Sequence, residues 1–137
     1  MNLSFTSNRR VIYADTDKMG IVYNGNYLSY FEIGRNELMR HLGLTYTKVE
    51  ENGLILPLID SYVKYIQPAF YDDVLEINAR LDETFSAKIQ FIYNIRCNDK
   101  LIAEGYTNHV FANADTMKPV RPPKMYLEIL NKHKGIV

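Results

Sequence analysis

Two different spacings of apolar residues divide the chain. Between Asn24 and Gly43, apolar side chains recur at steps of three and four, whereas Glu32, Arg35 and Arg40 fall on the other faces of the same helical pattern. Asparagine can cap the first turn of a helix and glycine commonly ends one, so the pattern predicts a helix of about 18 residues. Its expected buried face consists of Tyr27, Tyr30, Phe31, Gly34, Leu38 and Leu42.

From residue 54 onward the period changes to two. Apolar and polar residues alternate through three stretches, and a nearly continuous apolar run precedes them. Alternation is typical of strands with one buried face, and short turns between consecutive strands favour antiparallel pairing. With one more strand before the long helix, the predicted strands are residues 5–14, 54–67, 75–81, 88–97 and 101–112.

Two short helices complete the prediction. Thr47 and Glu50 have the spacing of a capping box, which predicts a helix over 47–52. A last helix is expected over 124–134, after a proline-rich break. This order of elements predicts an α+β fold, in which one long helix packs on the face of an antiparallel sheet, and a single domain over residues 1–137.

The composition is that of an ordinary globular domain. Of 137 residues, 47% are apolar, and 16 basic side chains balance 16 acidic ones, which argues against a nucleic-acid-binding protein with a broad basic face. No apolar run is long enough for a membrane span, and the first residues lack the apolar core of a signal peptide. We therefore expect a cytoplasmic protein. Cys97 is the only cysteine, which excludes an internal disulfide and a cysteine zinc site.

The segment before the long helix combines two carboxylates with a helix start. Asp15 and Asp17 precede the expected start of the helix at Asn24. Free N–H groups and the helix dipole would stabilise an oxyanion there, and a nearby carboxylate such as Asp17 can act as general base or nucleophile. Acidic residues before helices are also common turn formers, and we expect Asp15 to accept local backbone hydrogen bonds.

The other reactive residue types form no pattern that indicates a site. The histidines lie far apart without metal-ligand spacing, and no phosphate-binding loop or nucleophile elbow occurs. His41 is expected to be exposed at the end of the long helix, and His109 to be structural or exposed rather than catalytic. We expect no metal site.

The sequence YADTDKMGIVYNGNY at residues 13–27 closely resembles the active-site segment of hotdog-fold acyl-CoA thioesterases. It is most similar to the 4-hydroxybenzoyl-CoA thioesterase branch, which includes the Tol-Pal-associated short-chain enzymes. The resemblance implies a long helix wrapped by a curved antiparallel sheet, and a homodimer or homotetramer with its active site at a subunit interface. Further stretches resemble the family in matching order, at residues 30–35, 66–69, 71–75 and 118–123.

The resemblance also implies roles for single residues. Asp17 matches the family's catalytic aspartate, and Asn24 matches the position whose backbone N–H polarises the thioester carbonyl. Many members carry histidine or tyrosine at the latter position; asparagine keeps the backbone N–H but not a role of that side chain. Gly25 is expected to bind substrate while loosening the start of the helix, since glycine costs backbone entropy. Tyr23 and Tyr27 are expected to line the acyl pocket.

These roles define an enzyme that hydrolyses acyl-CoA thioesters to free acid and coenzyme A. Coenzyme A belongs to the substrate, so no further cofactor is expected. Its phosphates require basic partners, for which Lys88 is our candidate, with Lys64, Arg96 and Arg121 as others. Three alternatives remain open: a thioesterase acting on acyl carrier protein, a hotdog dehydratase or isomerase, and a non-catalytic acyl-thioester-binding protein. The dehydratase is disfavoured because no histidine precedes the long helix.

Overall fold

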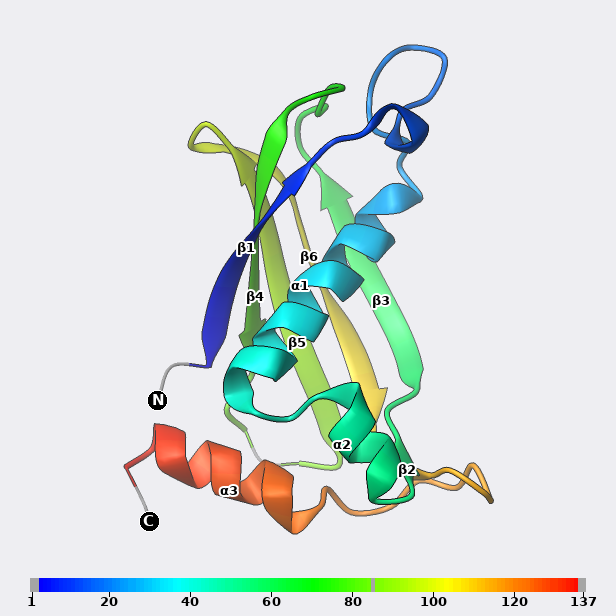
Figure 1. Ribbon diagram of the computed structural model, residues 1–137, viewed down its shortest axis with the longest axis vertical. Helices are drawn as coiled ribbons and strands as arrows, with labels where there is room; N and C mark the ends of the chain where they lie inside the picture. Colours follow the sequence, from blue (N-terminus) through cyan, green and yellow to red (C-terminus); the bar gives the residue numbers. More distant parts are fainter. Residues whose placement is uncertain (1–2, 85, 136–137) are drawn as a thin grey trace.

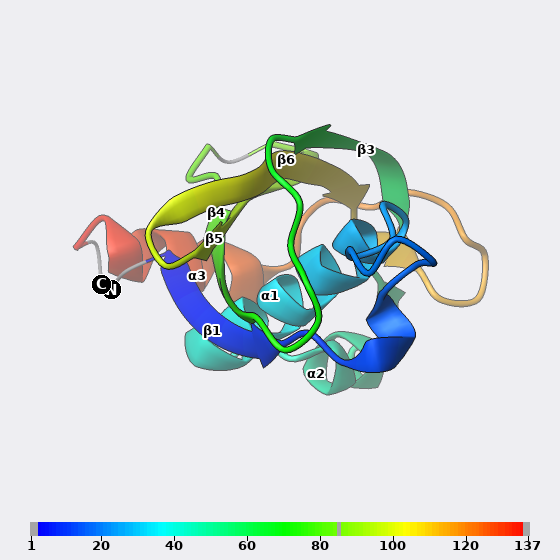
Figure 2. The same ribbon diagram turned by 90° about the horizontal axis from the view of Figure 1, so that it is seen from above.

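A five-stranded antiparallel sheet curves around one long helix (Figures 1 and 2). The computed structural model describes residues 3–84 and 86–135. The strand order is β1-β4-β5-β6-β3, and β2 pairs separately with β7. The strands are β1 (Ser4–Arg10), β2 (Leu54–Ile55), β3 (Leu58–Tyr65), β4 (Val74–Leu81), β5 (Lys88–Cys97), β6 (Lys100–Val110) and β7 (Ala112–Asn113).

Helix α1 (Asn26–Leu42) lies on the concave face of this sheet (Figure 2). All six residues of the expected apolar face are buried, which confirms the helical spacing. Gly34 permits a close approach to β4, because a Cβ atom there would lie 2.7 Å from the Ile77 side chain. Gly43 ends the helix with a φ of 78°, a conformation that glycine adopts without strain.

The start of α1 and one of its faces differ from the prediction. The helix begins at Asn26, after Gly25, and no side chain caps it. Arg35, expected on an exposed face, is only 8% exposed. Helical spacing cannot anticipate this burial, because the guanidinium is accommodated by hydroxyl partners that come from other elements.

Two predicted strands are shorter than expected. Strand β1 ends at Arg10. The Val11 N–H still donates to the carbonyl of Asp73 at 2.8 Å, and the chain then enters a 3₁₀ turn, η1 (Tyr13–Asp15). The apolar run over 54–67 is divided into β2 and β3 at Pro57, which lacks the N–H that a continuous strand would use. The remaining strands lie within two residues of their predicted bounds.

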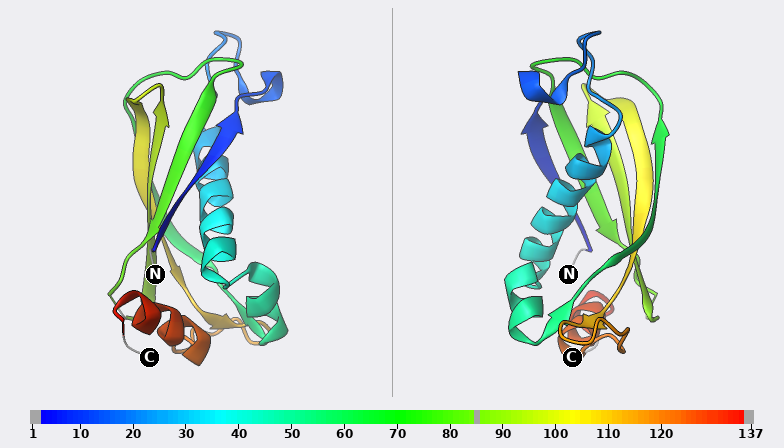
Figure 3. Two further views of the ribbon diagram at one scale, coloured as in Figure 1. Left: turned by 60° about the vertical axis from the view of Figure 1, so that its left-hand side comes forward. Right: turned by 90° about the vertical axis from the view of Figure 1, so that its right-hand side faces the viewer.

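Helix α2 (Tyr46–Glu51) starts one residue earlier than predicted, and the capping box is wrong. Thr45 is the capping residue: its backbone is extended, and its hydroxyl accepts from the Lys48 N–H at 3.3 Å. Thr47 already lies inside the helix. Helix α3 (Lys124–His133) crosses the end of the sheet (Figure 3). Among residues 3–84 and 86–135, no helix combines the length and apolar character needed to cross a membrane.

The residues set aside as structural behave as expected. His41 is exposed and its ring stacks on Phe5, with centroids 4.9 Å apart. His109 is buried: Nδ1 lies 3.2 Å from the carbonyl of Leu56, and Nε2 lies 2.9 Å from the hydroxyl of Thr107. Burial and the nearby Arg35 charge lower the pKa of His109 to about 4, so its ring is neutral at pH 7.

Candidate active site

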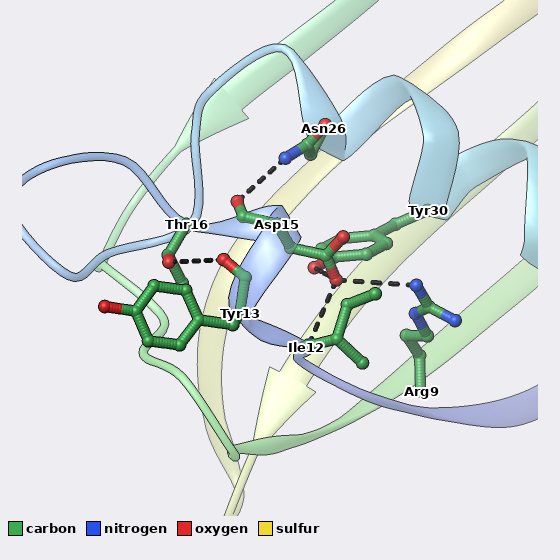
Figure 4. A network of polar contacts seen from close by, with 7 residues as sticks. All are labelled: Arg9, Ile12, Tyr13, Asp15, Thr16, Asn26 and Tyr30. Carbon is green, nitrogen blue, oxygen red and sulfur yellow. Dashed lines mark hydrogen bonds and ion pairs between the residues drawn. The ribbon is translucent and has the colours of Figure 1, made fainter.

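Asp15 fastens the loop before α1 to both the helix and β1 (Figure 4). Its Oδ2 accepts from the Tyr30 hydroxyl at 2.9 Å, from the Ile12 N–H at 3.2 Å and from Arg9 Nη2 at 3.5 Å. The Ile12 bond is the local backbone contact that the sequence predicts; the bonds to Tyr30 and Arg9 reach other elements. Burial, followed by the contact with Asp15, raises the pKa of Tyr30.

The carbonyl of Asp15 holds the segment that leads into α1. It accepts from Asn26 Nδ2 at 2.8 Å, as Figure 4 shows, and from the Tyr23 N–H at 2.9 Å. Sequence reasoning missed this role of Asn26, whose side chain points back to the loop instead of capping the helix. The start of α1 is therefore fixed against the loop by hydrogen bonds at two points.

Asp17 lies two residues farther along, at the surface of a tight turn. Its N–H donates to the carbonyl of Ile21 at 2.9 Å, and its carbonyl accepts from the Gly20 N–H at 3.1 Å. Gly20 has a φ of 80°, which the turn requires and glycine tolerates. Asp17 Oδ1 accepts from the Met19 N–H at 2.8 Å, and Oδ2 has no hydrogen-bond partner within the described ranges. One carboxylate oxygen is thus held and the other is open.

The start of α1 offers open hydrogen-bond donors near this carboxylate. The Asn26 N–H donates to the carbonyl of Tyr23 at 2.9 Å, and the Tyr27 N–H to the carbonyl of Asn24 at 3.3 Å. The N–H groups of Asn24 and Gly25 have no acceptor among residues 3–84 and 86–135. These two donors lie one turn before the first regular turn of α1, where the positive end of the helix dipole adds to them.

One cavity of about 320 Å³ brings the carboxylate and the helix start together. Tyr65, at the end of β3, closes one side of it, and its hydroxyl donates to the carbonyl of Asn24 at 3.2 Å. The tyrosine ring also packs edge-on against Tyr27, with centroids 5.4 Å apart. The cavity is lined by Asp17, Ile21, Val22, Asn24, Tyr27, Tyr65, Ile66, Gln67 and Pro68.

Of the site residues named from the sequence, Asp17, Asn24 and Tyr27 meet at this cavity. Sequence reasoning assigned no role to residues 65–68, which form its opposite wall. The resemblance did mark residues 66–69 as similar to the family, and this was the available signal. Tyr65 had no signal of its own, since it lies 41 residues from the carbonyl that it contacts.

Tyr23 packs over Gly25, and neither residue forms part of the cavity wall. A Cβ atom on Gly25 would lie 2.7 Å from Cε2 of Tyr23, so the ring of Tyr23 occupies the space that any other residue would fill. Gly25 has an ordinary helical φ of −64°, so a larger residue here would require the exposed ring of Tyr23 to move rather than a change of backbone conformation.

The strand registers place Lys88 far from the end of the sheet that carries Tyr65. It is the first residue of β5 and pairs with Val110, whereas Tyr65 pairs with Ala103 near the other end of β6. A role of Lys88 in binding the phosphates of coenzyme A stays a prediction, and within one chain it does not meet Asp17.

A second hollow of about 660 Å³ opens on the other side of the Asp17 turn. The exposed rings of Tyr13 and Tyr71 flank it, with centroids 5.5 Å apart, and Lys18 lies at its edge. Asp17 belongs to the walls of both hollows.

Residues 11–130 match the family model described as the thioesterase-like superfamily. The chain belongs to this superfamily. It is similar to a putative esterase of Aquifex aeolicus, at 37% identity over 93% of this chain and 98% of that protein. It is also similar to an acyl-CoA thioesterase of Haemophilus influenzae, at 33% identity over 84% of this chain and 85% of that protein.

Solved structures of this superfamily share the fold. A DHNA-CoA thioesterase from Staphylococcus aureus superposes with a TM-score of 0.88, at 28% identity over 96% of this chain and 91% of that one. The hotdog architecture implied by the resemblance is therefore confirmed: the curved sheet embraces α1 more fully than a simple two-layer arrangement requires (Figure 2). No described residues form a group of three or more histidine, cysteine or acidic side chains that could hold a metal ion.

Proposed function

We propose that the chain hydrolyses acyl-CoA thioesters, with Asp17 as the reacting carboxylate and the open N–H groups at the start of α1 as donors to the carbonyl. One observation carries the proposal: Asp17 and Asn24 line the same cavity, whose other walls are largely apolar. Acyl-CoA is the substrate class in the names of the Haemophilus influenzae relative and of the superposed Staphylococcus aureus enzyme.

The geometry supports a division of labour at the thioester. The carbonyl oxygen accepts from the open N–H groups of Asn24 and Gly25, which stabilise the negative charge that develops on it during attack. Asp17 Oδ1 is held by the Met19 N–H, which leaves Oδ2 free to react. It either removes a proton from the attacking water or attacks the carbonyl carbon itself, which gives an anhydride that water opens. By both routes the C–S bond breaks and coenzyme A leaves as a thiolate.

The remaining predicted residues receive supporting roles. Tyr27 and Val22 are both buried and line the acyl pocket. Tyr23 and Gly25 shape the turn that presents the open N–H groups. The steps require no metal and no cofactor apart from the coenzyme A of the substrate.

We further propose that two copies associate through β3. This edge strand offers unpaired backbone groups together with the exposed side chains of Leu58 and Ile59, which an unpartnered edge would have to protect. Antiparallel pairing of two β3 edges would bring the end of one sheet that carries Lys88 beside the cavity of the other chain. Light scattering of the purified chain tests this arrangement: a homodimer supports it, and a monomer at working concentration contradicts it.

Release of free thiol from a panel of acyl-CoA thioesters tests the function. The panel runs from acetyl to palmitoyl and includes benzoyl, 4-hydroxybenzoyl and phenylacetyl groups. The matched variant is Asp17→Asn, which keeps an oxygen for the Met19 N–H but loses the charge. Turnover by the wild type and its loss in the folded variant support the proposal. Turnover of an acyl carrier protein thioester alone would reassign the substrate, and binding without any turnover would favour a non-catalytic protein.

A further inference from the structure

Tyr65 is the only side chain from the sheet that reaches the backbone of the helix start among the described residues. Its hydroxyl donates to the carbonyl of Asn24 at 3.2 Å, and its ring is supported edge-on by Tyr27. The other donor to this carbonyl, the Tyr27 N–H, is at a longer 3.3 Å. The contact links β3 to the loop before α1, and both of its residues line the cavity.

Peptide geometry makes this contact relevant to the open donors. A peptide group is planar and trans, so its N–H points opposite to its carbonyl. The carbonyl of Tyr23, in the same peptide as the Asn24 N–H, is held by the Asn26 N–H at 2.9 Å. The carbonyl of Asn24, in the same peptide as the Gly25 N–H, is held by Tyr65. The direction of both open N–H groups is therefore set by what holds the carbonyl of the same peptide.

We propose that Tyr65 is a positioning residue for thioester hydrolysis: by holding the carbonyl of Asn24 it fixes the orientation of the Gly25 N–H, one of the two open donors that polarise the substrate carbonyl. The inference rests on the proposed function. A hydroxyl that donates to a peptide carbonyl also polarises that peptide, so the Gly25 N–H becomes a stronger donor. Tyr65 does not touch the reacting atoms and acts through the Asn24–Gly25 peptide.

The variant Tyr65→Phe tests the proposal because it keeps the ring and its contact with Tyr27 while removing the hydroxyl. We expect kcat to fall about three- to tenfold, the size of one lost hydrogen bond, with KM and the pH profile unchanged. The matched control is Tyr62→Phe. Tyr62 lies on the same strand but on the opposite face, where its ring stacks on Tyr106, and its hydroxyl has no part in the cavity.

A second measurement separates positioning from a structural role. A coenzyme A thioether, in which CH₂ replaces the carbonyl, cannot use the N–H donors and should bind wild type and Tyr65→Phe equally. The proposal is overturned if kcat of Tyr65→Phe equals that of wild type, or if thioether binding weakens as much as kcat falls. If the wild type itself releases no thiol, the proposed function fails; if only the Tyr65→Phe effect is missing, this inference alone fails.

Discussion

Two polar regions contact α1, one at its middle and one at its start, and they treat their polar groups in opposite ways. At the middle, Arg35 donates to the hydroxyls of Tyr93 at 3.0 Å and Tyr46 at 3.3 Å. The Tyr93 hydroxyl continues to Thr107 at 2.6 Å, and Thr107 continues to His109 at 2.9 Å. At the start, Asp17 Oδ2 and the N–H groups of Asn24 and Gly25 have no partner among the described residues.

The difference separates stability from function. A buried polar group must find a partner inside the protein, because leaving it unsatisfied costs about 1–3 kcal/mol, and the network around Arg35 meets this requirement. The loop at the start of α1 leaves its donors and one carboxylate oxygen open beside a cavity, where solvent or a ligand can satisfy them. Asp15 belongs with the first region and Asp17 with the second, although only one residue separates them.

The largest expected effect comes from Asp17→Asn. The substitution removes the carboxylate charge, so kcat should fall about 10²–10⁴-fold, the usual contribution of a general base. The side-chain oxygen that accepts from the Met19 N–H remains, and the urea midpoint of unfolding should therefore not move. Thiol-release kinetics and urea denaturation on the same preparation measure both quantities. A variant that unfolds more easily would place Asp17 with the structural region instead.

Acid should weaken the buried network through His109. Its pKa is lowered from 6.5 to about 4 in the folded protein, so the unfolded chain binds more protons between these values. This contribution to the free energy of unfolding is complete above pH 6.5 and is lost as the pH falls toward 4, by about 3 kcal/mol at most.

Urea denaturation across this pH range, compared between wild type and His109→Gln, measures the effect. The pH slope should shrink in His109→Gln, whereas the control His41→Gln, which changes an exposed histidine, should keep it. An equal slope in wild type and His109→Gln would show that His109 titrates in the fold as it does in the unfolded chain.

Arg35→Met should lower the free energy of unfolding by about 2 kcal/mol, because it removes charge-assisted hydrogen bonds to two tyrosines while keeping an apolar side chain in the same space. Arg35 does not line the cavity. The kcat per folded molecule should therefore stay within about twofold, which is less than the usual effect of losing one hydrogen bond. Arg40→Met, at an exposed position of the same helix, is the control and should change stability little. A large loss of kcat at unchanged stability would connect the two regions.

The smallest expected effect comes from Asn24→Ala. The proposed mechanism uses the backbone N–H of this residue and not its side chain. The kcat should therefore stay within about threefold of wild type, a smaller change than the loss of a hydrogen bond to a charged group would cause. Steady-state thiol release measures it. A fall comparable with that of Asp17→Asn would assign catalysis to the asparagine amide.

The long helix and the strands β4 to β6 were predictable because their periodicity reports burial directly. The spacing of apolar residues cannot reveal a charged side chain that is buried. Arg35 was therefore not recognised as a buried residue. Caps depend on the backbone conformation of one residue, which explains why Thr45 and not Thr47 starts α2.

The site was predictable only where its residues are close in the chain. Asp17 and Asn24 lie in one segment whose resemblance to a family is specific, and the structure places both at one cavity. Tyr65 and Gln67 reach the same cavity from another element, and only the pairing of β3 with β6 brings them there. Residue spacing carries no information on such a meeting of distant segments.

In the proposed mechanism, the open N–H groups at the start of α1 polarise a thioester carbonyl opposite Asp17. The most direct test is the infrared stretching frequency of a ¹³C-labelled carbonyl in the best substrate of the panel, bound to the slow Asp17→Asn variant. We expect a frequency lower than that of the same thioester in water, because fixed donors in a cavity weaken the C=O bond more than solvent does. A frequency equal to or above the value in water would contradict it.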